Sequence, residues 1–247
     1  MPVTDVNVYD AGIGACSGEE VGGVAAVATD GERPGAQQWV PAKPTLPALR
    51  QGVQECHGCE LYRDAIQGVM GDGPEDAELM VVGEQPGDKE DQQGTPFVGP
   101  AGRLLDKALA EAGLDPDAVY RTNVVKHFRF SGTRGKQRIH KSPSRAHVAA
   151  CGPWLVAELE LVRPTGVLLL GGTAGKALYG AGFRVGDARG QRQAWPSDIG
   201  GAVRSTYVPE WVVTTTHPSA ILRSRNRDED YAAFVSDLQV VRGALAG

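Results

Sequence analysis

The 247-residue sequence lacks several features that would assign it to a familiar class. Cysteine occurs only four times, which excludes a disulfide-rich secreted scaffold. No apolar run approaches the ~20 residues of a membrane-spanning helix, and the acidic start lacks the basic segment of a secretory signal. Hydrophobic residues make up 41% of the chain, which is long enough to bury a core. We therefore expect a cytoplasmic monomer that has no membrane partner.

Positive charge is also scarce for a protein that binds nucleic acid, since the net charge is −5. Its distribution is uneven, however. Six acids lie within residues 1–45, and no acid occurs between Asp117 and Glu158. That acid-free window indicates a surface that binds polyanions, although a solvated basic face explains it equally well. The eight bases in it are Arg121, Lys126, Arg129, Arg134, Lys136, Arg138, Lys141 and Arg145.

Composition divides the chain near residue 45. Residues 1–45 are rich in glycine, alanine and valine without a sustained period, and several prolines interrupt any helix near their end. We predict a flexible extension over residues 1–45, which contains Cys16, and a folded domain over residues 46–247.

Strands and helices are predicted to alternate along the folded domain. The expected strands are short apolar runs at Glu78–Gly83, Val119–Val125, Gly166–Leu170 and Trp211–Thr216. Helical periods lie between them near residues 104–112 and 148–162, and again over residues 228–245. This alternation predicts an α/β fold, a three-layer αβα sandwich with a central, mainly parallel four-stranded sheet. Ligands of such sheets bind beyond the carboxyl ends of the strands.

The segment Cys56-His57-Gly58-Cys59 is the first candidate site. Two thiolates at this spacing can bind an iron–sulfur or zinc centre. A redox dithiol is the alternative, but redox pairs normally follow a strand and none is predicted here. Cys151 offers a third ligand, and the fourth would be a histidine or Cys16.

Three further motifs carry chemistry of lower specificity. Gly83–Asp88 (GEQPGD) brings Glu84 to the end of a predicted strand, although an ordinary turn explains it as well. His217 follows the last predicted strand, where an imidazole can donate to a developing anion or serve only as a structural hydrogen bond. His140 lies in a basic loop, and flanking cations lower the pKa of an imidazole. A solvent-exposed loop histidine is the alternative.

The order of these motifs resembles that of the uracil-DNA glycosylase superfamily, and especially its iron–sulfur branch, family 4. The resemblance runs from about Val53 to Leu238 through C-x-x-C, G-E-x-P-G, P-F-V-G, T-N-V-V-K, a later cysteine and H-P-S. Family 4 has a cysteine where this chain has His127, and here an inserted basic loop ends in Arg138-Ile139-His140. Both departures are similar to the UdgX subclass, which forms a covalent bond to DNA.

The resemblance implies a [4Fe–4S] cluster as cofactor and uracil-containing DNA as partner. Single-stranded DNA would be preferred, and duplex DNA would be a second substrate form. The implied cluster ligands are Cys56, Cys59, His127 and Cys151. Phe97 would stack on the base, Asn123 would read its polar edge, and the neighbouring substrate-binding residues would be Gln85, Gly87 and Asp88. The implied contacts to flanking phosphates are Arg138, Lys141 and Arg223.

The resemblance also implies a division of labour in catalysis. His217, as a neutral donor, would stabilise the leaving uracil. His140 would attack C1′ of the sugar in place of water, and Glu84 would orient or deprotonate His140. We therefore expect a DNA repair protein that excises uracil once and remains attached to the abasic-site sugar. The alternatives are a family 4 enzyme that turns over, and a non-catalytic iron–sulfur protein that binds DNA or senses redox state.

Overall fold

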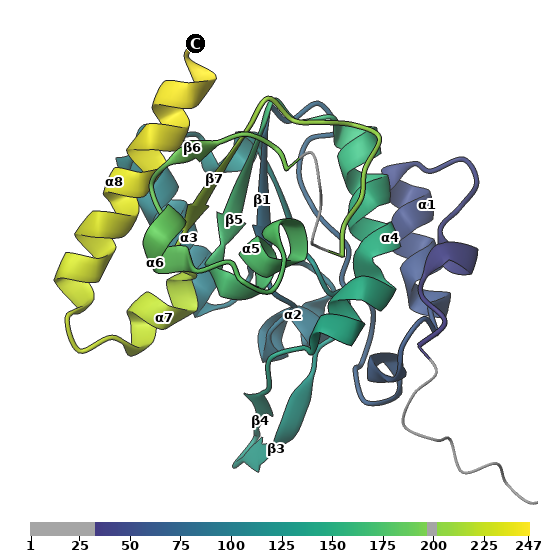
Figure 1. Ribbon diagram of the computed structural model, residues 1–247. Coiled ribbons are helices and arrows are strands. Elements are labelled where there is room, and N and C mark those ends of the chain that lie inside the picture. Colours follow the sequence, from purple (N-terminus) through teal and green to yellow (C-terminus); the bar gives the residue numbers. More distant parts are fainter. Residues whose placement is uncertain (1–32, 197–201) are drawn as a thin grey trace, which may run out of the picture. The chain divides into compact units, whose positions relative to one another are not determined.

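Figure 1 shows the computed structural model, which describes residues 33–196 and 202–247. Its main sheet has the strand order β2-β1-β5-β7-β6. The first four strands run parallel, as β2 (Val119–Asn123), β1 (Leu79–Gly83), β5 (Gly166–Leu170) and β7 (Trp211–Thr215). The predicted αβα fold with a mainly parallel sheet is confirmed. The count of four strands is one too low, because β6 (Arg192–Gln193) adds a polar, antiparallel edge of two residues.

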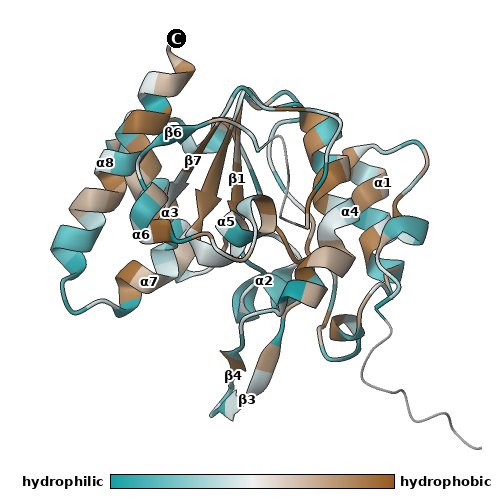
Figure 2. Ribbon diagram, viewed as in Figure 1, coloured by the Kyte–Doolittle hydropathy of each residue, from teal (hydrophilic) through white to brown (hydrophobic). Residues whose placement is uncertain are grey.

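Helices cover both faces of the sheet, so every position of the four parallel strands except Arg121 is buried. Along β1, Met80 and Val82 face one core and Leu79 and Val81 face the other. Burial on both faces explains why β1 and β5 read as continuous apolar runs, and β1 is brown in Figure 2. The first core packs under α1 (Leu46–Gly52), α4 (Arg145–Val162) and α5 (Gly171–Tyr179). The second packs under α3 (Pro100–Glu111), α7 (Pro218–Arg223) and α8 (Arg227–Leu245).

The predicted basic loop around His140 is instead a hairpin that projects beyond the sheet (Figure 1). It consists of β3 (Phe130–Arg134) and β4 (Gln137–His140), joined at Gly135, whose φ of 60° suits a two-residue hairpin turn. The hairpin lacks apolar alternation because most of its side chains face solvent, which is why the sequence pattern did not predict strands.

Short elements complete the described chain. They are η1 (Gln37–Trp39), η2 (Val53–Glu55), η3 (Glu60–Arg63), α2 (Asp88–Gln93), η4 (Pro116–Ala118) and α6 (Val185–Ala188). No helix within residues 33–196 and 202–247 is long and apolar enough to cross a membrane.

The domain begins before the predicted boundary at residue 46. Ala36 is buried, and its N–H donates to the carbonyl of Ala150 at 2.8 Å. The N–H of Gly35 donates to the carbonyl of Gly58 at 3.1 Å. These contacts are made by the main chain, so they leave no side-chain pattern in the sequence. The rest of the predicted extension, including Cys16, lies outside the described residues.

Candidate active site

A cavity of about 1210 Å³ opens beyond the carboxyl ends of the parallel strands. Its lining includes Glu84 after β1, Asn123 at the end of β2 and His217 after β7, together with Phe97 and His140. The structure therefore brings together side chains that are up to 133 positions apart (217 − 84 = 133). The volume exceeds the ~300–1,000 Å³ of ordinary small-molecule sites, which suits an extended ligand.

Close backbone packing fixes Phe97 and Asn123 at the base of this cavity. A Cβ on Gly83 would overlap Asn123 Oδ1 and come within 2.8 Å of Phe97 Cζ, so only glycine fits there. Phe97 itself has a φ of 58°, which is costly for a non-glycine residue. Gly102 of α3 permits this conformation, since a Cβ there would overlap the carbonyl of Phe97. The strained backbone conformation therefore belongs to Phe97, whose ring is predicted to stack on the base.

The environment of His217 fixes both its charge and its tautomer. Burial lowers its pKa to about 4, and nearby His140 and Arg223 favour the neutral form further. Its Nδ1 accepts a hydrogen bond from the N–H of Ser219 at 3.1 Å. A neutral ring that accepts at Nδ1 carries its proton on Nε2. His217 therefore presents an Nε2–H, and the donor role that the family resemblance implies for it stays a prediction.

His140 lies at the end of β4 and faces Glu84, with 3.3 Å between Nε2 and Oε1. Partial burial lowers the pKa of His140 and outweighs the opposing charge of Glu84, while Arg223 lowers it further. The imidazole is therefore mostly neutral near pH 7. Glu84 also accepts a hydrogen bond from the hydroxyl of Thr173. Thr173 has no predicted role, although it follows a predicted strand.

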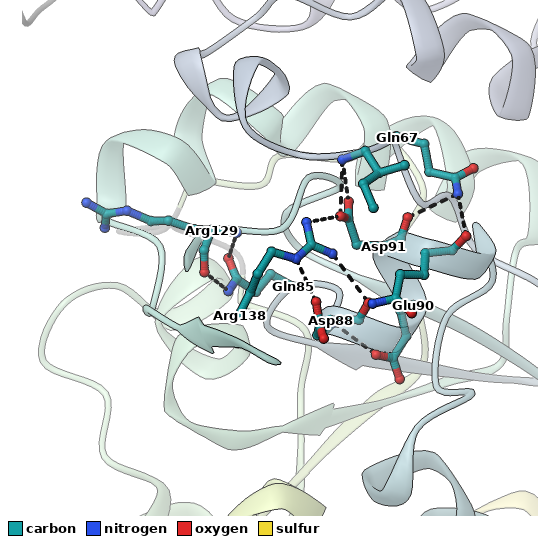
Figure 3. Close-up of polar contacts among 10 residues, drawn as sticks. Gln67, Gln85, Asp88, Glu90, Asp91, Arg129 and Arg138 are labelled. Carbon is teal, nitrogen blue, oxygen red and sulfur yellow. Dashed lines mark hydrogen bonds and ion pairs between the residues drawn. The ribbon is translucent and has the colours of Figure 1, made fainter. Parts of the chain in front are cut away.

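Arg138 lines the cavity but is held in ion pairs within the protein, so its predicted contact to phosphate stays a prediction. Its guanidinium pairs with Asp88 at 2.6 Å and with Asp91 at 2.7 Å, as Figure 3 shows. It also lies 5.1 Å from the ring centroids of both Phe128 and Phe130. Asp88 shares this ion pair and also lines the cavity, so its predicted contact to substrate stays a prediction. Together the two residues attach the hairpin to α2.

Gln85 and Gly87 are also engaged within the protein. The Gln85 side-chain amide donates to the carbonyl of Arg129 at 3.0 Å (Figure 3). It also donates to the carbonyl of Lys141 at 3.2 Å, which closes the base of the hairpin. The N–H of Gly87, predicted as a donor to substrate, donates to Glu90 Oε2 at 3.1 Å. The other oxygen of Glu90 accepts from Gly99 at 2.8 Å. Glu90 was missed, although glycine followed three residues later by glutamate is a helix-start pattern.

Only some of the basic residues between Asp117 and Glu158 lie on the protein surface. Lys126 is fully buried and pairs with Glu158 at 2.6 Å, and Arg121 pairs with Asp106 at 2.8 Å. Cations that do line the cavity include Arg134 and Lys136 of the hairpin and Arg223 at the end of α7. Lys141 is exposed just after β4, in keeping with its predicted contact to phosphate.

The three described cysteines, Cys56, Cys59 and Cys151, are buried free thiols. Burial raises the pKa of Cys59 to about 11 and that of Cys151 to about 12, and the neighbouring cysteines add to both increases. Two N–H groups point at sulfur: Trp154 Nε1 lies 3.3 Å from Cys56, and the Lys126 amide lies 3.2 Å from Cys151. Thiols that destabilise one another's charge in a buried pocket are suited to binding a cation.

His127 follows Lys126 and is also buried. Burial lowers its pKa to about 4, so the ring is neutral and able to bind a metal through nitrogen. Within residues 33–196 and 202–247, no three His, Cys, Asp or Glu side chains approach closely enough to hold a single metal ion.

Comparisons with known proteins agree with this geometry. Residues 70–239 match the uracil DNA glycosylase superfamily. The chain is 34% identical over 181 residues to the type-4 uracil-DNA glycosylase of Thermotoga maritima, covering 73% of this chain and 84% of that protein. It is 33% identical over 181 residues to the type-4 enzyme of Pyrobaculum aerophilum, covering 72% and 85%. This chain belongs to the uracil DNA glycosylase superfamily.

Proposed function

We propose that this protein excises uracil from DNA as the first step of base-excision repair. The observation that carries the proposal is the arrangement of Phe97, Asn123 and His217 around one cavity at the carboxyl edge of the sheet. Uracil is a flat base with alternating donors and acceptors on its edge. Phe97 offers a ring for stacking, Asn123 offers an amide that both donates and accepts, and His217 offers a neutral N–H donor. The relatives reported above, which are named type-4 uracil-DNA glycosylases, support the same activity.

Uracil departure follows from these three side chains. The base must leave the stack to enter the cavity, because its C1′ bond is inaccessible inside a duplex. Phe97 would stack on the base, and the Asn123 amide would pair with its polar edge. As the C1′–N1 bond breaks, its electron pair leaves with uracil. The Nε2–H of His217 would stabilise the resulting charge on a uracil oxygen.

Capture of C1′ completes the reaction. In a turnover enzyme, a water attacks the oxocarbenium-like carbon and passes a proton to a base. Glu84 is the carboxylate that would receive this proton, because it lines the cavity beside Asn123. The sugar is left as an abasic site, and uracil leaves after protonation. Similarity to type-4 enzymes favours this outcome.

A second outcome, covalent capture by His140, is favoured by one specific contact. The imidazole is mostly neutral and lies 3.3 Å from Glu84, the arrangement of a nucleophile beside its base. A ring nitrogen would form the bond to C1′, and the imidazolium formed would lose its ring proton to Glu84 or to solvent. The N–C1′ bond would persist because imidazole is a poor leaving group.

We also propose that Cys56, Cys59, Cys151 and His127 hold a [4Fe–4S] cluster. The fit rests on buried thiols that influence one another's pKa, on two N–H donors to sulfur and on a neutral histidine. Cysteine thiolates are the usual ligands of such a cluster, and a histidine can replace a cysteine in iron–sulfur centres. When bound, the cluster would link three segments rigidly: the turn between η2 and η3, the segment that follows β2, and α4.

Uracil release tests the main proposal directly. A single-stranded oligonucleotide with one uracil, incubated with a substoichiometric amount of protein, should become sensitive to alkali at that position. The same oligonucleotide with thymine is the matched control and should stay intact. Several turnovers per protein indicate capture by water, whereas one turnover with a complex that survives boiling in SDS indicates capture by His140. The absence of any uracil release would refute the proposal.

A further inference from the structure

A fully buried ion pair lies beneath the candidate active site. Lys126 Nζ and Glu158 Oε2 are 2.6 Å apart, and both side chains are 0% exposed. Burying two charges carries a large desolvation cost, and apolar replacements of such pairs often leave stability unchanged or improved. The stability of the fold therefore does not by itself account for this pair.

Every polar group of the pair has a partner. Lys126 Nζ donates to Glu158 and also to Thr122 Oγ1 and the Asn123 carbonyl, each at 2.7 Å. The second carboxylate oxygen of Glu158 accepts from the Gly71 N–H at 2.7 Å and from Tyr120 OH at 3.1 Å. With three donors used, the ammonium has one orientation, so the Asn123 carbonyl is held in one place.

The residue that Lys126 holds is the one that would read the base. Asn123 is the last residue of β2, and its side chain lines the cavity. The next amides, of Val124 and Val125, donate to the carbonyls of Gly83 and Glu84 at 3.0 and 3.1 Å. The ammonium thus fixes the strand end on the side away from the cavity.

The main chain of Lys126 reaches the cysteines. Its N–H donates to Cys151 Sγ at 3.2 Å, and its carbonyl accepts from Val69 at 2.8 Å. One residue therefore contacts Asn123 through its side chain and a cysteine through its amide.

We propose that Lys126 is a positioning residue for Asn123. Its ammonium sets the direction from which the Asn123 amide meets the base, and its main chain fastens that strand end to the cysteine-lined pocket. Reading by two hydrogen bonds requires a placement within ~0.5 Å, so a small displacement of the strand end weakens recognition. The inference rests on the proposed function, because Asn123 needs a base to read.

The test removes the ammonium without leaving a buried unpaired charge. Lys126→Met/Glu158→Gln keeps the main-chain contact to Cys151 and an acceptor oxygen for Gly71. Single-turnover uracil release should slow by about 10- to 100-fold, the loss expected when a reacting group is misplaced. Tyr120→Phe is the matched control, because it removes one donor to Glu158 and leaves Lys126 in place. It should change the rate by less than about threefold.

A double-mutant cycle with Asn123→Ala separates positioning from general loosening. Asn123→Ala removes the amide but keeps the carbonyl that Lys126 holds. If Lys126 acts through this amide, adding Lys126→Met/Glu158→Gln to Asn123→Ala should slow the reaction by less than about twofold. Losses that multiply across the two sites would overturn the proposal.

Binding supplies a second readout. Oligonucleotides with 2′-fluoro-2′-deoxyuridine, which resists excision, are compared with the thymine sequence. The Lys126→Met/Glu158→Gln variant should lose its preference for uracil and keep its affinity for thymine DNA. If this variant does not fold, Lys126→Gln/Glu158→Gln, which retains a neutral donor, enters the same cycle. If neither folds, the pair serves the fold and the proposal is wrong.

The two proposals fail differently. Wild-type protein without uracil release or uracil preference refutes the proposed function, and this inference with it. Active wild-type protein with multiplying losses refutes only the role of Lys126.

Discussion

The charge state of His217 leads to a prediction about pH. An ordinary histidine has a pKa of 6.5, whereas burial lowers that of His217 to about 4. At pH 5, about 3% of an ordinary imidazole is neutral, compared with about 90% of one with the lower pKa. If neutral His217 supports uracil departure, the rate at pH 5 should stay within about 10% of its neutral-pH value as far as this group is concerned.

The assay is single-turnover uracil release from single-stranded DNA between pH 4.5 and 8, with visible absorbance recorded at each pH to follow the proposed cluster. It is run on wild type and on His140→Gly, because His140 titrates in the same cavity. His147→Gln is the control, since burial lowers the pKa of His147 but this residue does not line the cavity. An acid limb near pH 6.5 in His140→Gly would refute the assignment of His217 as a neutral donor.

The same shift has a consequence for stability. Below pH 6.5 the unfolded chain binds a proton at residue 217 that the folded chain excludes until about pH 4. Stability is therefore highest above pH 6.5 and falls as the pH drops through this window. The excluded proton corresponds to a loss of about 3 kcal/mol at the acid end of this window. Chemical denaturation should be less sensitive to pH over this range in His217→Gln.

Three further changes test the site. His140→Gly should abolish any SDS-resistant complex with uracil-containing DNA but retain uracil release, because base departure depends on other side chains. Loss of both the complex and uracil release would mean that His140 acts before capture. His127→Cys should keep the visible absorbance expected of the proposed cluster, whereas His127→Ala should lose this absorbance or bind less iron. Full iron content in His127→Ala would show that His127 is not a ligand. Gly83→Ala should slow uracil release by about 100-fold, since the added methyl overlaps Asn123 and approaches Phe97; an unchanged rate would show that these side chains need not be held so closely.

The sheet and the strand-end residues were predictable for one physical reason. Parallel strands covered on both faces are apolar throughout, so β1, β5 and β7 are visible as runs without alternation. Their carboxyl ends meet at one edge, which directs attention to Glu84 and His217. Both line the cavity.

The missed features share a different cause. The hairpin β3–β4, the segment before residue 46 and the role of Glu90 depend on hydrogen bonds to the main chain. Main-chain groups are the same at every position, so such bonds leave little trace in a sequence. The phosphate contact of Arg138 was implied by the family resemblance, and nothing in the basic window itself indicates that Arg138 forms ion pairs within the protein. Its carboxylate partners lie 50 and 47 residues away (138 − 88 = 50; 138 − 91 = 47), where only the fold brings them close.

The hairpin explains how one fold could support either fate of C1′. A two-stranded hairpin alone is marginally stable in water. Here Arg138 fastens it to α2 through two carboxylates, and Gln85 ties its base to the loop after β1. Those attachments place His140 against Glu84, the same carboxylate that would otherwise serve water. In the proposed mechanism, uracil is released by Asn123 at the end of β2, Phe97 before α3 and His217 after β7, whereas His140, which would compete with water, lies on the hairpin. Base departure and sugar capture would then be carried by different parts of the chain, so that either could change without loss of the other.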